Sequence, residues 1–368
     1  MTSSRLEQLH TALAQAGLDA VMLNPGPTLT YLTQLHFHLM ERPVVLLFTP
    51  DKDPVIVLPE LELPKVSLIP YKVNAFAYGE NPSDWGTVFH KAILSLGLDG
   101  GKIGVEPRQL RLLEFQYVRD GAIEAEFPDA TEVLGSLRLR KDQAEIKAIR
   151  TAVKVAQDAL EATLPSIRIG STEKQIAAEL TVQLLKHGSE PELPFSPIVS
   201  GGPNSANPHA SPSERKLQSG DLLVVDWGAT VDGYISDLTR TFAVGNVEPE
   251  FEKIAGIVLS ANDAGRKAGR PGVPCANVDK AARSVIEQSG YGIYFTHRTG
   301  HGIGMEDHEE PYMRGDNTQM LYPGMTYTVE PGIYLPGRGG VRIEDNVLVT
   351  NDSVEILSDM PRELRLVG

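Results

Sequence analysis

The chain has 368 residues, 41% of them hydrophobic and 22% charged, which is the composition of an ordinary globular protein and not of a disordered one. At this length we expect two domains, because a single hydrophobic core rarely grows beyond about 300 residues. The formal net charge of −14 would repel nucleic acid and anionic lipid, and this excludes both as partners.

Residues 3–16 have the pattern of an amphipathic helix that stops at Gly17, without the basic and apolar regions of a secretory signal. No later apolar run reaches the roughly 18 residues that a membrane span requires. The single cysteine, Cys275, can form neither an internal disulfide nor a thiolate zinc site, so oxygen and nitrogen atoms must hold any bound metal. Together these features favour a cytoplasmic location.

Helical and strand patterns alternate up to about residue 125. This part contains neither a glycine-rich phosphate loop nor a nucleophile elbow. We therefore expect a self-contained mixed α/β domain over residues 1–130. Its expected strands are 18–24, 42–48, 53–59, 73–79 and 102–107, and its later helices are 84–98 and 108–122.

A second domain is expected over residues 131–368, and it opens with a long amphipathic helix. Asp142 and Glu145 have the spacing of an N-terminal capping box for this helix, and Thr172 and Gln175 repeat that spacing before another one. The first elements of this domain are then helices over 141–164 and from 172 to 188, followed by a strand over 197–202.

The second domain carries a weak internal repeat. Gly170 and Gly188 flank one expected helix, and Gly272 and Gly290 flank another at the same offset of 102 positions (272 − 170 and 290 − 188). Glycine is common, so this coincidence is weak evidence by itself. It gains weight if functional residues recur at a similar offset.

Residues 221–244 read as two strands joined by Asp232-Gly233, a dipeptide suited to a tight hairpin turn. With a two-residue loop, Asp226 faces position 239, and Asp237 lies diagonally from Asp226 on the same face because side chains alternate along a strand. Two carboxylates then converge. Their repulsion requires something positive between them.

A second strand pair is expected around a longer loop, and it presents Glu330 and Glu344. These acids follow Asp226 and Asp237 by 104 and 107 positions (330 − 226 and 344 − 237), close to the offset of the glycines. Each half of the repeat therefore supplies one pair of acids, in apolar sequence where an uncompensated carboxylate is costly. The two strands are expected over 325–334 and 339–350.

His301 lies in the segment TGHGIG, where glycines on both sides let the main chain approach a neighbour closely. One imidazole together with hard carboxylate oxygens suits one or two divalent ions such as manganese, cobalt or zinc. Bridging carboxylates suit two ions about 3.5–4 Å apart. The predicted metal ligands are Asp226, Asp237, His301, Glu330 and Glu344.

Two further histidines, His209 and His308, lie beside prolines in loop-like sequence, from which side chains can reach a cleft. We expect a functional role for both. The other histidines, including His297, have no comparable context and are expected to be structural.

These residues resemble the pita-bread metallopeptidases, which include Xaa-Pro aminopeptidase, prolidase and methionine aminopeptidase, with creatinase as a metal-free relative. The resemblance covers the whole chain. It implies an α/β (α+β) fold, in which the mixed α/β domain of the proline-directed members precedes a pita-bread catalytic domain with an internal pseudo-twofold repeat. The matching pattern is Asp226, ten residues, Asp237, His301 in GHGIG, Glu330 in VEPG and Glu344 in RIED.

By this resemblance Asp226 would bind one metal ion, His301 and Glu330 the other, and Asp237 and Glu344 both. Two divalent ions (manganese, cobalt or zinc) would lower the pKa of a bridging water and make it the nucleophile.

The resemblance also implies roles for groups around the metals. Glu330 could pass a proton to the departing nitrogen, and His209 and His308 would hold the substrate carbonyl and stabilise the oxyanion as catalytic and substrate-binding residues. Arg342 resembles a family arginine beside the last ligand. It could bind substrate or support the carboxylates.

The expected activity is hydrolysis of the Xaa-Pro bond at the N-terminus of peptides or in Xaa-Pro dipeptides, by a homodimer. The proline nitrogen has no N–H and its ring fixes φ, so general peptidases handle this bond poorly. A strict dipeptidase must also read a carboxylate after proline, and Arg314, Arg338 and Arg342 are the candidates. The spacing of these arginines in the sequence does not identify which of them binds the carboxylate.

Two alternatives remain. A methionine aminopeptidase-like activity is disfavoured by the long α/β segment ahead of the catalytic part. A non-catalytic peptide-binding module on the same fold is disfavoured because all five ligand positions are intact.

Overall fold

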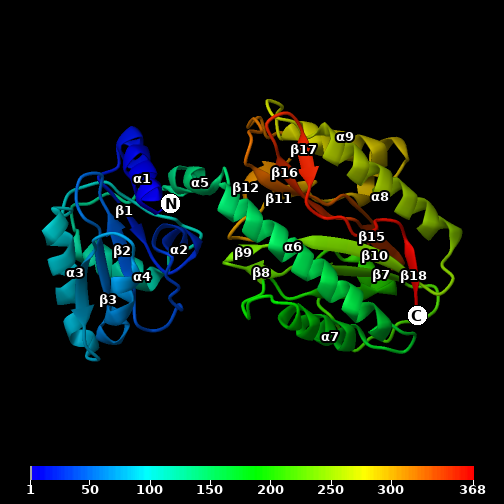
Figure 1. Cartoon of the computed structure of the whole chain (residues 1–368), viewed down its shortest axis with the longest axis horizontal. Helices are drawn as coiled ribbons and strands as arrows, with labels where there is room; N and C mark the ends of the chain where they lie inside the picture. The colour runs from blue at the N-terminus through cyan, green and yellow to red at the C-terminus, as the bar shows by residue number, and fades with distance from the viewer. Residues whose placement is uncertain (1) are drawn as a thin grey trace. The chain divides into compact units, whose positions relative to one another are not determined.

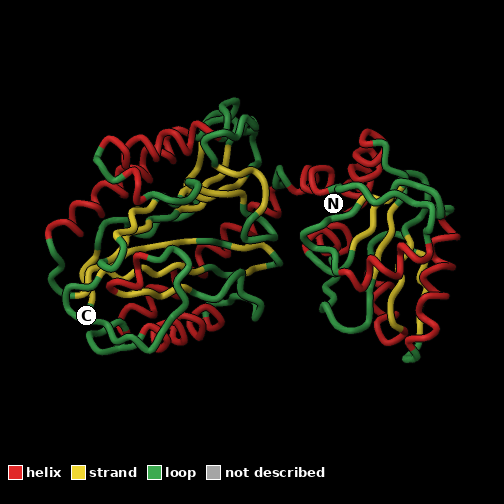
Figure 2. Tube along the Cα trace, turned by 180° about the vertical axis from the view of Figure 1, so that it is seen from behind, coloured by secondary structure: helices red, strands yellow, loops and turns green. Residues whose placement is uncertain are grey.

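The computed structural model describes residues 2–368, with side chains from Arg5 onward. It divides into two compact units, Met1–Arg138 and Leu139–Gly368 (Figures 1 and 2). Each unit has its own buried apolar clusters. Within the described residues, no helix combines the length and the apolar character that crossing a membrane requires.

The expected boundary at residue 130 lies at the start of helix α5 (Thr131–Arg138), whereas the structure divides at the end of this helix. Leu134 and Leu137 of α5 are buried, and α5 packs against α1 (Thr2–Ala16) of the N-terminal unit. Because this apolar face is covered by the N-terminal unit, α5 belongs to that unit.

The N-terminal unit is built on a five-stranded mixed sheet in the order β4-β3-β2-β1-β5. Strands β1 to β3 are fully buried, which explains their continuous apolar runs. The strands and helices that the sequence predicts here are all present. They are β1 (Ala20–Leu23), β2 (Val45–Phe48), β3 (Val55–Pro59), β4 (Asn74–Tyr78), β5 (Ile103–Gly104), α3 (Pro82–Leu96) and α4 (Leu112–Gly121).

Besides α5, two helical segments of this unit were not predicted. Helix α2 (Pro27–Thr33) is short and begins after Gly26, so its Gly-Pro start reads as a turn. The 3-10 segment η1 (Glu60–Leu68) contains Pro64 and has no buried residue. Neither segment has the long apolar periodicity from which a helix is recognised.

Four helices of the C-terminal unit form two packed pairs, α6 with α7 and α8 with α9 (Figure 1). Both predicted capping boxes are confirmed: Asp142 caps α6 and Thr172 caps α7, each with the reciprocal bond from the third helical residue. The helices are α6 (Gln143–Thr163), α7 (Glu173–Lys186), α8 (Pro249–Ala268) and α9 (Ala276–Gln288), with short 3-10 segments η2 (Leu164–Ser166), η3 (Gly202–Ala206) and η4 (Gly292–Tyr294).

The two main sheets of this unit have the strand orders β18-β10-β7-β6 and β12-β11-β13-β16-β17. Apolar residues of α6 and α7 pack on the first sheet, and those of α9 pack on the second. The strands are β6 (Ile198–Gly201), β7 (Leu222–Trp227), β8 (Thr230–Val231), β9 (Tyr234–Ile235), β10 (Leu238–Val244), β11 (Gly300–Gly302), β12 (Glu309–Met313), β13 (Thr326–Val329), β14 (Gly332–Leu335), β15 (Gly339–Arg342), β16 (Asp345–Val349), β17 (Val354–Ile356) and β18 (Arg365–Val367).

The repeated glycines occupy equivalent positions in the two halves. Gly170 and Gly272 have φ of 91° and 79°, and Gly188 and Gly290 have φ of 107° and 83°, a conformation that other residues rarely adopt. The amides of the first pair even make matching bonds, from Gly170 to the carbonyl of Leu217 (2.9 Å) and from Gly272 to that of Leu321 (2.8 Å). The glycine offset thus reflects a structural repeat.

The second predicted strand pair is broken where one continuous hairpin was expected. Strand β13 pairs with β16, and β14 pairs with β15, so pairing stops at Glu330-Pro331 on one side and at Ile343-Glu344 on the other. Proline lacks the N–H that a continuous ladder needs, which accounts for the interruption. The break falls at the two predicted ligands of this half.

A matched pair of glycine substitutions tests the structural role of the repeated glycines. Gly272→Ala should lower the free energy of unfolding by about 1 kcal/mol, because alanine is strained at positive φ. Gly256→Ala, in the exposed middle of α8, should raise it by about 0.5–1 kcal/mol. An added Cβ would meet no atom within 4 Å at either position, so only the backbone differs. Urea denaturation measures both, and equal effects would contradict the assignment.

Candidate metal centre

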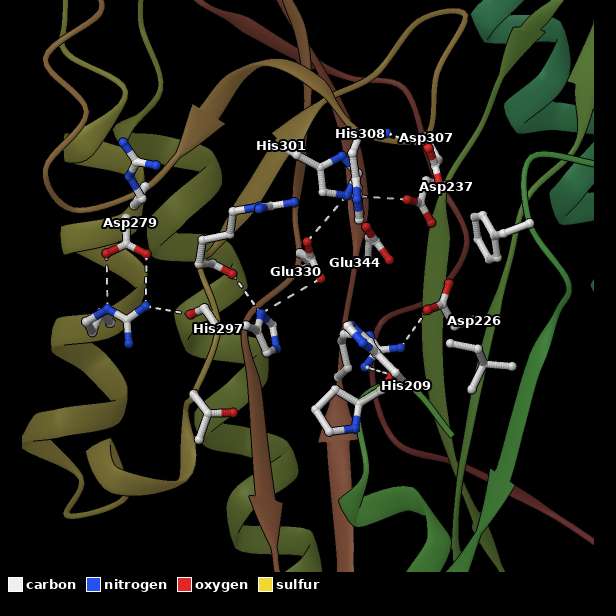
Figure 3. A pocket seen from close by; sticks show the side chains of 18 of the residues that line it. His209, Asp226, Asp237, Asp279, His297, His301, Asp307, His308, Glu330 and Glu344 are labelled. Atoms are coloured by element: carbon white, nitrogen blue, oxygen red, sulfur yellow. Dashed lines mark hydrogen bonds and ion pairs between the residues drawn. The ribbon is translucent and has the colours of Figure 1, made fainter. Parts of the chain in front are cut away.

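A cavity of about 950 Å³ in the C-terminal unit gathers the site residues that the sequence predicts (Figure 3). Their side chains come from both halves of the internal repeat and point toward one another in the close view. The residues brought together are His209, Asp226, Asp237, His301, His308, Glu330, Arg342 and Glu344.

The first pair of acids is positioned by the β7–β10 hairpin. Asp226 pairs with Thr239, the position that the two-residue turn at Asp232-Gly233 predicts. Asp237 directly precedes β10, and both carboxylates are buried. The convergence expected from the alternation of strand side chains is therefore present.

The second pair of acids lies where the pairing of the strands is interrupted. Glu330 follows β13 and Glu344 precedes β16, beside the pairing of Val329 with Asp345. An isolated bridge between Thr239 and Glu344 joins this half to the first. The Thr239 hydroxyl donates to Glu344 Oε2 at 2.7 Å, which fixes one oxygen of that carboxylate.

His301 lies in β11 between two glycines that are needed for close packing. A Cβ on Gly300 would lie 1.9 Å from the Thr328 carbonyl oxygen, and one on Gly302 would lie 2.2 Å from that of Glu310. The glycines predicted to permit a close approach therefore bring β11 against its neighbouring strands.

The imidazole of His301 is oriented for coordination. Its Nδ1 lies 3.1 Å from the Gly302 carbonyl, an acceptor, so Nδ1 carries the proton and Nε2 carries the lone pair. That lone pair faces Asp237 Oδ2 and Glu330 Oε1, each at 3.5 Å. Three acceptors facing one another suit a cation between them.

The donor set fits a divalent cation. Asp237, His301 and Glu344 each place one ligand atom within 4.8 Å of the others, and all three are buried. Asp226 Oδ1 and Glu344 Oε1 are buried acceptors without a hydrogen-bond partner. A buried acceptor without a hydrogen-bond partner lowers the stability of the fold unless a bound ion interacts with it. Oxygen and imidazole ligands suit several divalent metals.

The pKa shifts of the clustered groups also favour a bound cation. Burial, followed by repulsion from neighbouring carboxylates, raises the pKa of Asp237 and of Glu344 well above the ordinary range. Burial raises the pKa of Glu330 to about 7, against the opposing charges of Arg342 and Arg298. Burial, followed by the charge of His308, holds the pKa of His301 well below its usual value. The protein alone leaves this cluster short of positive charge.

Three predicted residues surround the cluster. His209 is exposed at the cavity, and His308 places its ring centroid 4.1 Å from that of His301. Arg342 Nη2 donates to Asp226 Oδ2 at 2.6 Å, so its guanidinium supports that carboxylate. A direct role of these residues in binding substrate stays a prediction.

The sequence reasoning missed His297, which it expected to be structural. His297 lines the cavity, where its Nδ1 lies 4.0 Å from Glu330 Oε2 and its Nε2 lies 2.9 Å from the Tyr334 hydroxyl. The same hydroxyl accepts from Arg342 Nη1 at 2.9 Å. A hydrogen-bonded chain thus links His297 through Tyr334 and Arg342 to Asp226. The signal available was its place four residues before His301.

A pair on α9, the buried Asp279 with the half-buried Arg283, was also missed. Asp279 accepts from the amide and hydroxyl of Thr299, and Arg283 donates to Asp279 and to the His297 carbonyl at 2.7 Å. This pair braces the loop that leads into β11. Asp279 looks like an ordinary polar residue of an amphipathic helix, so periodicity gave no signal.

Comparison with known proteins decides the family. Residues 147–351 match the sequence model of Metallopeptidase family M24, and residues 5–140 match that of the Creatinase/Prolidase N-terminal domain. The chain belongs to metallopeptidase family M24. The resemblance to pita-bread metallopeptidases and the predicted fold, a mixed α/β domain followed by a pita-bread domain with an internal repeat, are therefore confirmed.

Individual M24 relatives match over almost their whole length. The chain is 37% identical to probable dipeptidase PepE of Mycobacterium tuberculosis, over 99% of this chain and 96% of that protein. Among solved structures, a dipeptidase from Pyrococcus horikoshii OT3 superposes with a TM-score of 0.92 at 36% identity, covering 99% of this chain and 100% of that one. A prolidase from Thermococcus sibiricus superposes with a TM-score of 0.94 at 31% identity, covering 100% and 99%.

The raised pKa of Glu330 predicts how stability of the metal-free protein depends on pH. Folding lifts this pKa from 4.5 to about 7, so the protonated acid favours the folded state below pH 4.5, and that contribution is lost as pH rises to 7. The difference in unfolding free energy between wild type and Glu330→Gln should therefore shift against wild type across this window. Thermal unfolding of chelator-treated protein measures it. A shift in favour of wild type would contradict the burial of Glu330.

Proposed function

We propose that this M24 metallopeptidase hydrolyses the Xaa-Pro bond and acts mainly on dipeptides. The observation that carries the proposal is the buried cluster of Asp237, Glu344 and the free Nε2 of His301. Relatives named dipeptidase and prolidase, matched over nearly their full length, support cleavage of dipeptides that end in proline.

Two divalent ions (manganese, cobalt or zinc) fit the donor set. We assign Asp226 to one ion, His301 and Glu330 to the other, and Asp237 and Glu344 to both. Bound there, the ions would supply Lewis acidity toward the scissile carbonyl and lower the pKa of water. The two oxygens without partners, on Asp226 and Glu344, support this assignment.

The protein's own groups would handle protons and the substrate carbonyl. Proline leaves as a secondary amine and needs a proton on its nitrogen. Glu330, whose carboxylate lies 3.5 Å from His301 in the cluster, would carry that proton. His209 and His308, at the edge of the cluster, would hold the carbonyl oxygen as negative charge develops on it.

The chain from His297 to Asp226 would keep the site in one arrangement. His297 donates from Nδ1 to the Arg298 carbonyl at 2.7 Å and accepts at Nε2 from Tyr334, so it is neutral. Its pKa is lowered to about 4, mainly by burial and then by Arg342. A neutral His297 adds no positive charge that would compete with the ions for Glu330.

A cytoplasmic location and a homodimer belong to the same proposal. The first follows from the composition and the single buried Cys275, and the second from the family resemblance. Sedimentation analysis tests the dimer.

An assay on purified protein tests the activity. After metal removal, added manganese, cobalt or zinc should restore release of free amino acid from Ala-Pro, and Ala-Pro-Ala should be a poorer substrate. Asp237→Asn keeps the side-chain size but removes a ligand charge, so activity should fall by more than the roughly 100-fold that loss of a supporting residue costs. Asp307→Asn, an exposed acid on the same cavity, should stay within a few-fold of wild type.

Other outcomes separate the alternatives. Release of methionine from Met-Ala-Ser without cleavage of Ala-Pro would support the methionine aminopeptidase-like reading. Binding of these peptides without metal-dependent hydrolysis would support a non-catalytic module. Full activity of Asp237→Asn would remove this residue from the ligand set.

A further inference from the structure

A buried ion pair lies behind the loop that carries His308. Lys141 Nζ lies 2.5 Å from Glu309 Oε1, and the two side chains are only 1% and 6% exposed. Removing two charges from water costs about as much as their attraction returns, and replacing such a pair by apolar residues is often neutral or stabilising. The stability of the fold alone therefore does not account for this pair.

The lysine is held firmly at its main chain. Lys141 precedes α6, and its amide donates to the Gly324 carbonyl at 2.8 Å. Beside it, Arg140 Nε donates to the Pro323 carbonyl at 3.0 Å. Both contacts lie on the turn before β13, the strand that leads to the predicted ligand Glu330. The ammonium group is thus fixed relative to the metal centre.

The glutamate is the first residue of β12, and the loop before it packs on its carboxylate. Gly302 of β11 pairs with Glu309, so the residues between them connect the two strands. A Cβ on Gly304 would lie 2.5 Å from Glu309 Oε1, so the main chain of this loop touches the carboxylate. The Gly304 carbonyl accepts from the Ile235 amide at 2.9 Å. The conformation of the loop therefore depends on where the carboxylate lies.

His308 leaves the chain on the opposite side from Glu309. The buried positions of β12 are Glu309, Pro311 and Met313, and His308 comes one residue before the first of them. Because successive side chains alternate, His308 lines the cavity and Glu309 does not. Figure 3 shows His308 beside His301, with ring centroids 4.1 Å apart. Both side chains share one stretch of backbone, so a shift of Glu309 moves His308.

We propose that Lys141 and Glu309 are positioning residues, which act through His308 on the oxyanion that develops at the substrate carbonyl. This inference rests on the proposed function and deepens it. A charge-assisted hydrogen bond is directional and sets the start of β12 more precisely than apolar packing does. A displacement of about 1 Å at a catalytic group can lower the rate about 100-fold. The ion pair thereby supports kcat and not substrate affinity.

Paired substitutions in the manganese-loaded full chain separate positioning from stability. Lys141→Met leaves the Glu309 carboxylate buried without its cation, so the melting temperature should fall. The double variant, Lys141→Met with Glu309→Met, replaces both charges by apolar side chains, so the melting temperature should return to that of wild type. On Ala-Pro the double variant should still lose about 10- to 100-fold in kcat, with KM changed less than about threefold. Recovery of kcat together with the melting temperature would overturn the proposal.

A double-mutant cycle locates the effect at His308. In the His308→Ala background, the double variant's substitutions should lower kcat by less than about threefold, because the side chain through which the ion pair acts is gone. Losses that multiply would contradict the proposal. The control is Lys174→Met, which removes an exposed lysine that pairs with Glu214 at 2.9 Å, and it should keep the kcat of wild type.

Crystal structures of wild type and the double variant supply a readout that does not depend on turnover. The His308 ring should be displaced by about 1 Å or more, while Asp237 and Glu344 keep their positions. An unmoved His308 would rule out the positioning role. Failure of wild type to hydrolyse Ala-Pro would count against the proposed function, while the comparison of the two structures still decides whether the ion pair positions His308.

Discussion

Four carboxylates buried in one cavity repel one another, and the surrounding structure is organised around this repulsion. Asp226 is partly neutralised by Arg342, and Glu344 is tied at one oxygen by Thr239. The neutral imidazole of His301 lies between Asp237 and Glu330, at 3.5 Å from each. A divalent metal bound in the cluster would supply the positive charge that is still missing. Burial and this shortage together account for the raised pKa values, and the shortage accounts for the buried oxygens without partners.

The fold holds this cluster together by joining two similar halves. Each half presents one acid at the end of a strand and one at the start of its partner, and the bridge between Thr239 and Glu344 sets the two halves edge to edge. Behind the ligands, Arg240 donates to the carbonyls of Thr239 and Glu344 and to the carboxylate of Asp345. Such supporting bonds keep ligands in place before an ion arrives. The cavity is therefore preorganised by the chain itself.

Much of the fold and of the site could be predicted from local sequence features. The Asp232-Gly233 turn fixed the register that brings Asp226 opposite Thr239, and capping spacings located α6 and α7. Contacts between residues far apart in the sequence could not be predicted in this way. His297 has no sequence feature that announces Tyr334 as its partner, and an amphipathic α9 gives no sign that Asp279 supports the loop before β11.

The central claim is that these five side chains share cations, and diffraction near the manganese absorption edge tests it most directly. Crystals soaked in manganese should show two anomalous peaks about 3.5–4 Å apart, both within coordination distance of Asp237 and Glu344. One peak should also contact Asp226, and the other His301 and Glu330. Manganese bound elsewhere, or none in this cavity at saturating concentration, would contradict the account.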